Sequence, residues 1–514
     1  MNIFAQLKNL FRKGGAKLGM VNSLVNITDD PRISIPASEY SRIRLAKTYY
    51  KDDLKPIRYK NSLGVMKERP ISSINITKMS AHRLASIIFN EQCTVNIQNE
   101  QADALLDEVI KDNDFYNRYE EHLENGIALG GFAIRPYIEN DKVKLAYINA
   151  DQFYPLHTNQ DEVDAAAVAS TITKTESDRT IYYTLLEFHE WDGEAYKITN
   201  ELYRSESPSQ VGINVPLSTL AEYENLAPSV ELNGLTKPLF AYFKAPGANN
   251  KRLDSPLGLG IVDNAKSIVD AINMTHDQFV WEVKNGRRKI AVPAEMIKPG
   301  ARFGNEQDVD NQRKPMLDDE TDVYLQLFGD TERLSIQDLT SSIRNTEYQQ
   351  TMDFFLSEFE NAIGLSQGTF TNMPSGVKTA TEVVTNNSMT YQTRSSYLTQ
   401  VEKQLKNLVV AIFELMSCGQ LYTDGQARFT GNVEELDIVV DFADGVFTDK
   451  TTQFTQDSQA VTMGVMPKKR FLMRNFNLDE QQADQWLEEL EAEQPENNIN
   501  SLLENNDYPG NGDD

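Results

Sequence analysis

The sequence predicts an α+β protein with about three domains, and three observations support this class. Apolar residues recur at helical spacing over long stretches, as between Ile261 and Val283. Two β-rich runs flank Asp192-Gly193, a pair of residues that favours a hairpin turn. The chain has 514 residues, of which 40% are hydrophobic and 25% charged. At roughly 150 residues per domain, this length and composition fit an ordinary folded multidomain chain.

The charge and the cysteine content limit the function classes. A net charge of −26 argues against a broad basic surface that holds nucleic acid or an anionic membrane. It fits a conduit past which DNA slides, because a negative wall repels phosphates. The longest apolar run, Leu408 to Phe413, is too short to span a bilayer, and we expect no secretory signal. Cys93 and Cys418 have no metal or redox spacing, so folding in a reducing compartment without disulfides is expected.

Residues 1–29 form a basic amphipathic arm. Apolar residues such as Ile3, Leu7 and Phe11 fall at helical spacing among lysines and arginines, and no acidic residue precedes Asp29. A membrane-surface helix or a targeting segment would have a similar pattern. We favour a terminal arm that docks on a neighbouring chain or stays mobile.

Residues 30–250 are predicted to mix helices and strands. The periodicity predicts helices at 73–89 and 98–129, followed by strands at 132–138 and 143–148. The hairpin should pair 181–191 with 195–203, with Gly193 supplying the positive φ of the turn.

Two long helices with a β-containing insert are predicted next. Ser255 is a suitable N-cap and Pro256 suits the first helical position, so the first helix should run from Leu257 to Asn285. Gly286 should end it in the left-handed conformation. Short strands at 289–292 and 323–328 flank a polar stretch, and a second helix is expected after Leu334, from about residue 336 to 363.

A loop rich in Gly, Ser, Thr and Asn follows at 364–378 and leads into a very long helix that ends before Gly419. The first half of this helix is polar, which suits contact with other chains. A strand at 436–442 and helices at 450–463 and 479–493 complete the folded part. The acidic segment after Pro495 is predicted to be disordered.

The sequence contains no arrangement that indicates catalysis, a metal site or a cofactor. There is no GxxxxGK[ST] phosphate loop, no HExxH and no GxSxG. The isolated Gly258-Leu-Gly260 is better interpreted as a close packing point than as a nucleotide site. The acidic run Asp318–Asp322 could hold Mg²⁺ or Ca²⁺, but it matches no EF-hand loop, and we favour a solvated surface.

One basic cluster stands out in this acidic chain: Lys284, Arg287, Arg288 and Lys289. Cations at a helix C-terminus are stabilised by the helix dipole, which would be a purely structural role. The functional alternative is contact with phosphates or with an acidic partner surface. The residues themselves do not favour either interpretation.

Several stretches, in this order, resemble the portal proteins of tailed bacteriophages, especially of siphophages of Gram-positive hosts. They are Glu121-His-Leu-Glu-Asn-Gly-Ile-Ala-Leu-Gly-Gly131, Ala150-Asp-Gln-Phe-Tyr-Pro155, Ile343-Arg-Asn-Thr-Glu347, Gly364-Leu-Ser-Gln-Gly-Thr-Phe370 and Gly464-Val-Met-Pro-Lys-Lys-Arg-Phe-Leu472. The resemblance covers residues 30 to 490, with Pro467 where the family often has Ser. It implies a non-enzymatic ring, usually a dodecamer, at one capsid vertex of the virion.

The resemblance also implies a portal-type division of the chain. The wing would comprise 30–250, the long helix 379–418 and the return strand 419–445. Stem helices at 251–285 and 336–363 would flank the clip at 286–335, and the crown would be 446–494, before the acidic tail 495–514. The loop 364–378 resembles the family's channel (tunnel) loop, in which we choose Ser375, Gly376 and Lys378 as DNA-facing residues.

The partners implied are double-stranded DNA passing without sequence specificity, the terminase motor, head-completion or adaptor proteins, and the major capsid and scaffold proteins. Assembly would take place in the host cytoplasm. Two other classes remain alternatives. One is a different virion protein, such as a scaffold or capsid component. The other is a metal-dependent DNA-processing enzyme that uses the run Asp318–Asp322.

Overall fold

The computed structural model describes residues 23–60, 64–89, 93–159, 162–176, 178–286, 290–293, 324–327, 336–338, 340, 342–371, 388–442, 450–476, 478 and 480–493. The chain divides into two units, Met1–Phe442 and Ala443–Asp514. None of the helices in these ranges combines the length and the apolar character needed to cross a bilayer.

The largest sheet of the first unit is antiparallel and has the strand order β1-β11-β10-β9-β8-β7, with β12 also pairing with β10. Its strands are β1 (Ser23–Leu24), β7 (Phe153–Asn159), β8 (Glu162–Glu176), β9 (Arg179–Asp192), β10 (Ala195–Ser205), β11 (Gly212–Val215) and β12 (Ser229–Asn233). The predicted hairpin is confirmed: Asp192 pairs with Ala195, and Gly193 has φ +64°. Strands β7 and β8 were not predicted.

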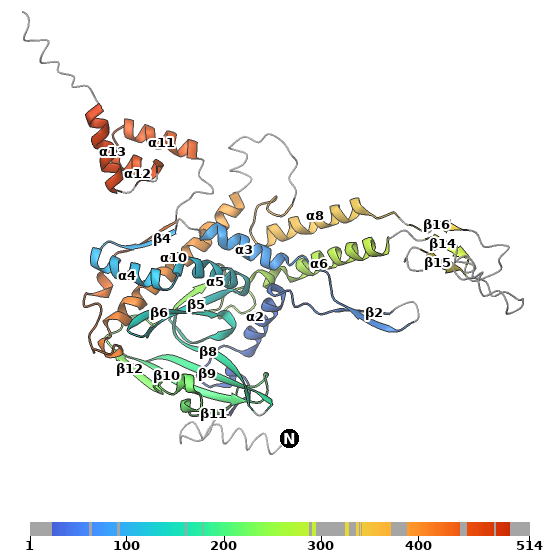
Figure 1. Ribbon diagram of the computed structural model, residues 1–514, viewed down its shortest axis with the longest axis horizontal. Helices are drawn as coiled ribbons and strands as arrows, with labels where there is room; N and C mark the ends of the chain where they lie inside the picture. The colour runs from blue at the N-terminus through green and yellow to red at the C-terminus, as the bar shows by residue number, and fades with distance from the viewer. Residues whose placement is uncertain are drawn as a thin grey trace, which may run out of the picture. The chain divides into compact units, whose positions relative to one another are not determined.

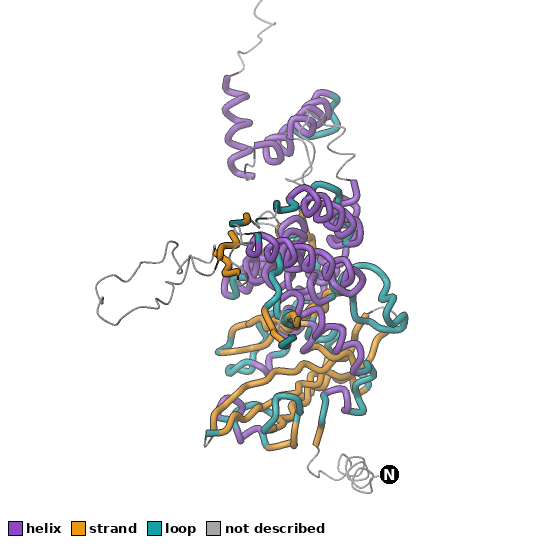
Figure 2. The backbone as a smooth tube through the Cα atoms, turned by 90° about the vertical axis from the view of Figure 1, so that its right-hand side faces the viewer, coloured by secondary structure: helices purple, strands orange, loops and turns teal. Residues whose placement is uncertain are grey.

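A second sheet, β13-β5-β6, contributes the centre of the core. Figure 2 shows helices gathered on one side of the strands. The strands are β5 (Gly131–Glu139), β6 (Lys142–Asn149) and β13 (Ala241–Lys244), and the helices are α2 (Ala37–Tyr50), α3 (Ile76–Ile88), α4 (Glu100–Asp112), α5 (Phe115–Leu129) and α10 (Ser388–Ser417). The fully buried rings of Tyr119, Phe132 and Phe243 pack in series, with centroids 5.7 and 5.5 Å apart. Burial of such rings is a main source of core stability.

Strand β4 (Cys93–Ile97) pairs with β17 (Ile438–Phe442), which brings the predicted return strand back to the first half of the chain. Both cysteines are free and buried. Burial raises the pKa of the Cys93 thiol to about 12 and that of Cys418 to about 11.

Short 3₁₀ helices connect the larger elements at Ile27–Asp29, Ala150–Gln152, Leu217–Thr219, Ala221–Tyr223, Gly419–Leu421 and Val433–Glu435.

The prediction of a single helix at 98–129 is wrong, because α4 and α5 are separate helices. Asp114 adopts a left-handed conformation with φ +47°, which a helix interior does not allow. The Asn113 side chain explains the break: its amide donates to the Val143 carbonyl at 3.0 Å, and its oxygen accepts from the Leu145 N–H at 3.1 Å. This bonding to β6 stabilises the break, and it depends on tertiary contacts that periodicity does not reveal.

The predicted long helix is confirmed as α6 (Ile261–Asn285), but its start and its cap are wrong. The helix begins four residues later than expected, and the Asp263 carboxylate accepts from the Gly260 N–H at 2.7 Å. Ser255 instead donates to Glu39 at 3.0 Å. Gly286 has φ −74°, so it does not adopt the left-handed conformation expected of it.

Gly258-Leu-Gly260 is a close packing point, as the sequence indicated. A Cβ at Gly258 would lie 2.1 Å from the Gly130 carbonyl oxygen, and one at Gly260 would lie 2.2 Å from that of Ala128. Backbone this close leaves room for glycine only.

The second helix of the pair, α8 (Asn345–Ala362), begins later than the predicted residue 336. Residues 337–338 instead form β16, which pairs antiparallel with β14 (Ile290–Pro293), and β14 also pairs parallel with β15 (Tyr324–Leu327). The two predicted strands of the insert are therefore confirmed with slightly different bounds. Asp318–Asp322 lie outside the described residues.

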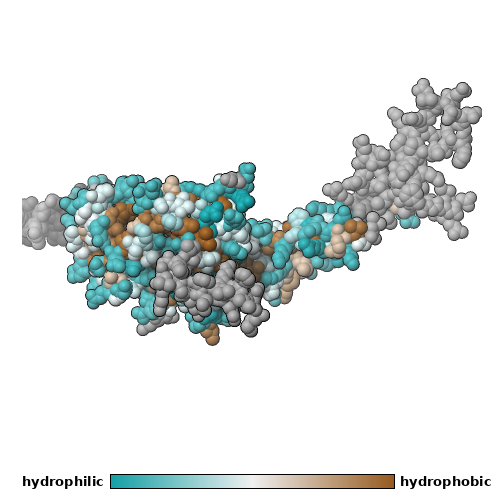
Figure 3. All heavy atoms as spheres, turned by 90° about the horizontal axis from the view of Figure 1, so that it is seen from below, coloured by the Kyte–Doolittle hydropathy of each residue, from teal (hydrophilic) through white to brown (hydrophobic). Residues whose placement is uncertain are grey.

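Helices α6 and α8 lie side by side and project from the sheets of the first unit (Figure 1). A hairpin of β2 (Ile57–Lys60) and β3 (Met66–Arg69), called the ribbon below, lies on the other side of α6 from α8. Hydrophobic residues reach the surface of the projecting part among polar ones (Figure 3).

The second unit contains α11 (Lys450–Thr462), α12 (Lys468–Phe476) and α13 (Glu480–Glu493). Helix α12 was not predicted. Aromatic rings join the three helices: Phe454 lies 5.4 Å from Phe471, and Phe476 lies 5.6 Å from Trp486. Asp457 is buried and accepts from the Asn475 side chain at 3.0 Å.

Candidate functional site at the helix pair and the loop base

Most of the site residues chosen from the sequence lie outside the described residues. This holds for Ser375, Gly376 and Lys378 of the predicted channel loop and for Arg287, Arg288 and Lys289 of the basic cluster. Lys284 is described, and its side chain is exposed in the last turn of α6. The structure therefore shows the supports of these segments, namely the helix pair and the two ends of the loop.

The outer end of the helix pair is fastened by Glu282 and Arg344. The Arg344 guanidinium reaches the Glu282 carboxylate at 2.6 and 3.2 Å, and the Arg344 backbone N–H donates to it at 3.0 Å. These hydrogen bonds lower the pKa of Glu282 to about 2. One turn inward, the rings of Phe279 and Tyr348 pack with centroids 5.1 Å apart. The chain thus leaves α6 and enters α8 at a fixed point.

Asp277 attaches the ribbon to α6. Both of its carboxylate oxygens accept from the Arg69 guanidinium at 2.6 Å, and the Ser72 N–H donates to it at 2.9 Å. The Asp277 side chain is 3% exposed, and the Arg69 hydrogen bonds hold its pKa below the ordinary value. Arg69 also lies over Trp281, 4.6 Å from the ring centroid. Bidentate pairing combined with stacking fixes the orientation of the ribbon.

Glu360 closes the start of the loop. Its side chain lies fully buried near the end of α8 and accepts from the backbone N–H groups of Phe370 at 2.5 Å, Thr371 at 3.1 Å and Gly368 at 3.3 Å. The Thr371 hydroxyl donates to it at 3.2 Å. A carboxylate that accepts hydrogen bonds from several backbone N–H groups holds a turn in place, because each charge-assisted hydrogen bond is stronger than a neutral one.

The far end of the loop is tied to the same place. Ser366 and Thr390 exchange hydrogen bonds: the Ser366 N–H donates to the Thr390 hydroxyl at 2.8 Å, and the Thr390 N–H donates to the Ser366 hydroxyl at 3.1 Å. Thr393 donates to the Gly364 carbonyl at 2.6 Å. We call residues 364–371 with Thr390 and Thr393 the loop base. Residues 372–387, between the two parts of this base, lie outside the described residues.

Helix α10 carries the loop base into the body of the first unit. The buried Arg394 donates to the Ile87 carbonyl at 2.9 Å, and Gln404 accepts from the Tyr119 hydroxyl at 2.7 Å. Near its other end, the buried Glu414 accepts from the N–H groups of Thr236 at 2.7 Å and Lys237 at 3.1 Å. Burial raises the pKa of Glu414.

Sequence reasoning missed Glu360, Asp277 and Glu414. A signal for them existed: each is an acidic residue within a helical stretch that also has a clear apolar stripe. The sequence could not reveal their partners, because those partners are backbone N–H groups or residues far along the chain.

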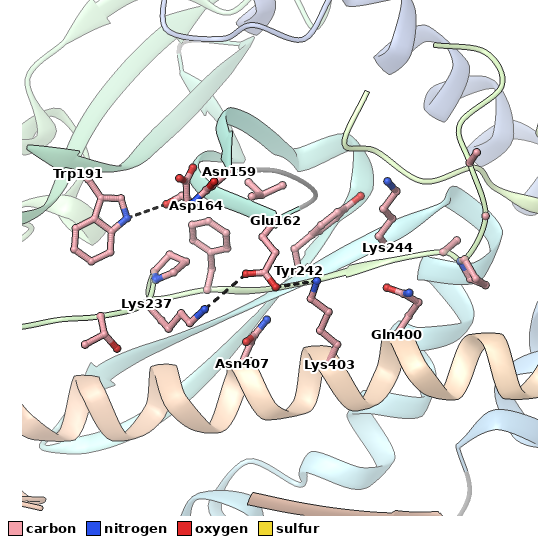
Figure 4. Close-up of a pocket in the computed structure, with 18 residues that line it drawn as sticks. Asn159, Glu162, Asp164, Trp191, Lys237, Tyr242, Lys244, Gln400, Lys403 and Asn407 are labelled. Atoms are coloured by element: carbon pink, nitrogen blue, oxygen red, sulfur yellow. Dashed lines mark hydrogen bonds and ion pairs between the residues drawn. The ribbon is translucent and has the colours of Figure 1, made fainter. Parts of the chain in front are cut away.

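A pocket of about 960 Å³ lies between α10 and the sheets (Figure 4). Three lysines line it, and Glu162 takes contacts from two of them, Lys403 at 2.8 Å and Lys237 at 3.7 Å. The Lys403 hydrogen bond lowers the pKa of Glu162. The third lysine, Lys244, also lines the pocket, as do Gln400 and Asn407 of α10.

A buried polar network lies on β9. His189 is within hydrogen-bonding distance of Glu187 at 2.6 Å and of the Tyr196 hydroxyl at 2.9 Å, and all three are buried. Arg135 approaches Glu187 at 3.0 Å. Burial raises the pKa of Glu187, but Arg135 and His189 outweigh that effect and hold it at about 2. Because the network is buried, it fits a structural role in positioning β9 better than contact with substrate.

Within the described ranges, three or more His, Cys, Asp or Glu side chains nowhere gather as a metal site would require. What the arrangement offers is mechanical: a braced helix pair, a β-containing insert at its outer end, and a loop base joined by hydrogen bonds.

Solved structures similar to this chain include those of gene transfer agent (GTA) particles. The neck of an empty GTA particle, computed with C6 symmetry, matches with 11% identity and TM-score 0.40, over 83% of this chain and 94% of that chain. The virion of a native GTA particle matches with 10% identity and TM-score 0.34, over 84% and 98%. The neck of a native particle, computed with C12 symmetry, matches with 11% identity and TM-score 0.35, over 77% and 88%. No curated protein sequence matches the chain significantly.

The sequence family described as "Phage portal protein, SPP1 Gp6-like" matches residues 29–496. This range agrees with the resemblance inferred from the sequence, which spans residues 30 to 490. The match covers the sheets, the helix pair, the loop and the helices of the second unit. It leaves out the basic arm and most of the acidic tail. The chain belongs to the SPP1 Gp6-like family of phage portal proteins.

Proposed function

We propose that this portal protein forms a ring, most simply a dodecamer, around a channel through which viral DNA is packaged and later ejected. It would sit at one vertex of the capsid, after assembly in the host cytoplasm. The family is structural, and the sequence has no nucleotide-binding motif, so a separate terminase would drive packaging. The net charge of −26 supports a channel wall that repels phosphates.

The loop base is the observation that carries the proposal. The two ends of the loop base, 364–371 and Thr390 with Thr393, are joined by hydrogen bonds, among them those of the Ser366–Thr390 exchange, and the start is held by Glu360. Such a base positions a loop against a passing duplex without gripping it, since the polar Ser, Thr and Asn side chains of this stretch carry little charge. We propose that Ser375, Gly376 and Lys378 approach the DNA.

The remaining parts take the portal roles expected from the sequence. We propose that the sheets, α10 and β17 form the wing, that α6 and α8 form the stem, and that the three short strands β14, β15 and β16 belong to the clip. The clip would bind terminase and later the head-completion or adaptor proteins. The second unit would be the crown. Lys284, Arg287, Arg288 and Lys289 would contact DNA phosphates or an acidic partner where stem and clip meet. The wing would face the capsid and scaffold proteins.

Two measurements, made one after the other, test this proposal. Negative-stain electron microscopy with mass determination of the purified chain should show rings with an axial hole wide enough for duplex DNA. A persistent monomer at high concentration would contradict the ring.

The second measurement uses a variant in which residues 374–384 are replaced by a shorter Gly-Ser linker, so that the loop base is kept. It should form normal rings and yet fail to support DNA packaging. The matched control replaces residues 500–510 of the acidic tail in the same way and should package normally. Normal packaging by the loop variant would refute the role of the loop.

A further inference from the structure

Among the described residues, the ribbon is a sheet of two strands with no third strand beside it. A hairpin of two strands is at best marginally stable in water without a third strand or a covering element. Both strands are exposed along most of their length, and Val65 and Met66 are 52% and 56% exposed. Tyr59 and Arg69 connect the ribbon to α6 at Trp281 and Asp277. Such an exposed edge calls for a partner.

The register identifies the face of the ribbon that needs covering. Tyr59 pairs with Lys67 and Ile57 with Arg69, and this is the face that packs on α6. The opposite face carries Arg58 paired with Glu68 and Lys60 paired with Met66. Residues 55–69 contain five basic residues and one acidic residue. On the outward face Arg58 lies 3.5 Å from the Glu68 carboxylate, so the positive charge of Lys60 leaves this face weakly basic, and the apolar Met66 lies beside Lys60.

Helix α8 presents a complementary surface. Glu347, Thr351, Phe354, Glu358 and Asn361 are all exposed and recur every three or four residues, so they form one line along the helix, which we call the α8 stripe. Phe354, at its centre, is 58% exposed. The helix contains four acidic residues and no basic one. The α8 stripe is therefore acidic with an apolar centre.

The ribbon and α8 lie on different sides of α6 (Figure 1). They also lie at a similar level along it. Tyr59 and Arg69 contact Trp281, and the next residue, Glu282, binds Arg344 just before α8 begins. The ribbon is thus level with the Glu347 end of the α8 stripe. Two unlike, complementary surfaces at one level are what a head-to-tail contact between rotationally related copies requires.

We propose that the ribbon of one copy docks on the α8 stripe of the next copy, with Lys60 against Glu347 and with Met66 on the apolar part of the stripe. This inference rests on the ring proposed above and assigns part of its subunit interface. Each copy gives its ribbon to one neighbour and receives a ribbon from the other, so the contact repeats until the ring closes.

Carbodiimide crosslinking within assembled rings tests the contact, because this reagent joins lysine amines to carboxylates that touch. Unlabelled and ¹⁵N-labelled chains are mixed before assembly, rings are isolated by size, and the crosslinked peptides are identified by mass spectrometry. We expect linked peptides that join Lys60 to Glu347 in which one partner is heavy and the other light. Rings that give no such peptides, or only heavy–heavy and light–light pairs, would overturn the ribbon contact and leave the ring intact. Failure to form rings at all would overturn the ring as well.

Charge reversal provides a second, independent readout. Glu347→Lys and Lys60→Glu should each raise the chain concentration needed for half-maximal ring assembly by about tenfold, since one attraction per interface becomes a repulsion. The double variant should return to near the original value. Glu108→Lys, an equal charge change at an exposed site on α4, is the control and should leave assembly unchanged. Single variants that assemble normally, or a double variant that behaves as the sum of its parts, would refute the pairing.

Discussion

Removal of the Glu360 carboxylate should release the start of the loop while the rest of the fold stays intact. In Glu360→Ala, the backbone N–H groups of Phe370 and Thr371 lose the acceptor that the structure gives them. The Gly368 N–H is less affected, because it also donates to the Thr371 hydroxyl at 2.9 Å. The effect should therefore concentrate on two amides.

The magnitude follows from these two donors. A buried donor left without an acceptor costs about 1–3 kcal/mol, so two of them cost about 4 kcal/mol before relaxation. If the segment opens so that water satisfies the two donors, the free-energy difference between the closed and the open form falls by about this amount. Amide protection at residues 370 and 371 should then fall by about three orders of magnitude, since each 1.4 kcal/mol is about a factor of ten. Glu360→Gln keeps one acceptor oxygen and should lose about 2 kcal/mol, or about thirtyfold in protection.

Hydrogen–deuterium exchange with peptide-level mass spectrometry measures this directly. Peptides that cover 364–371 should exchange faster in the variants, while those of β9 and β10 should keep their wild-type rates. Glu358→Ala is the matched control, because this carboxylate is exposed on the same helix two residues away. If protection at residues 368–371 stayed within about threefold of wild type in Glu360→Ala, the role assigned to Glu360 would be wrong.

Three further changes test other parts of the structure. Arg69→Ala should leave the buried Asp277 carboxylate with the Ser72 N–H as its remaining hydrogen-bond donor among the contacts described above, and should cost about 2–3 kcal/mol of stability. It should also red-shift the fluorescence of Trp281, over which Arg69 lies. An unchanged spectrum and unchanged amide exchange in the ribbon would contradict the attachment of the ribbon to α6. Gly260→Ala should lower the free energy of unfolding in denaturant by about 3 kcal/mol, because its Cβ would meet the Ala128 carbonyl oxygen at 2.2 Å. Gly193→Ala, in open space at φ +64°, should cost about 1 kcal/mol. Equal losses would refute the packing argument. The pKa of Glu187, at about 2, lies below the ordinary 4.5, so the contribution of this carboxylate to stability is present above pH 4.5 and is lost as the pH falls towards 2. When unfolding is measured across this range, Glu187→Gln should flatten the dependence of the unfolding free energy on pH. An unaltered slope would show that another group is responsible.

Local signals in the sequence predicted those elements whose cause is itself local. The hairpin around Asp192-Gly193 is an example, because the turn chemistry lies within the pair. The long helices were predicted from their stripes, as were the strands of the insert. Strand β8 was missed because Ala165, Ala166 and Ala167 have low β propensity, although they are buried between neighbouring strands.

Elements with a distant cause could not be predicted. The break between α4 and α5 depends on hydrogen bonds from Asn113 to β6, 30 and more residues away. Ser255 does not cap the helix that Ser255-Pro256 predicted at this point; it bonds instead to Glu39, some 216 residues earlier. For the same reason, the sequence indicated a loop at 364–378 but not the buried carboxylate that anchors it.

The two buried thiols have a practical consequence. With pKa values near 12 and 11, only about one part in 10³ or less of either sulfur is ionised at pH 8, and the side chains are shielded from solvent as well. Thiol-directed dyes and spin labels should therefore ignore the native chain. A single cysteine placed at an exposed position, such as Met66 or Phe354, would become the one reactive handle on the folded protein. Distances between neighbouring copies could then be followed by spectroscopy without first removing Cys93 or Cys418 from the core.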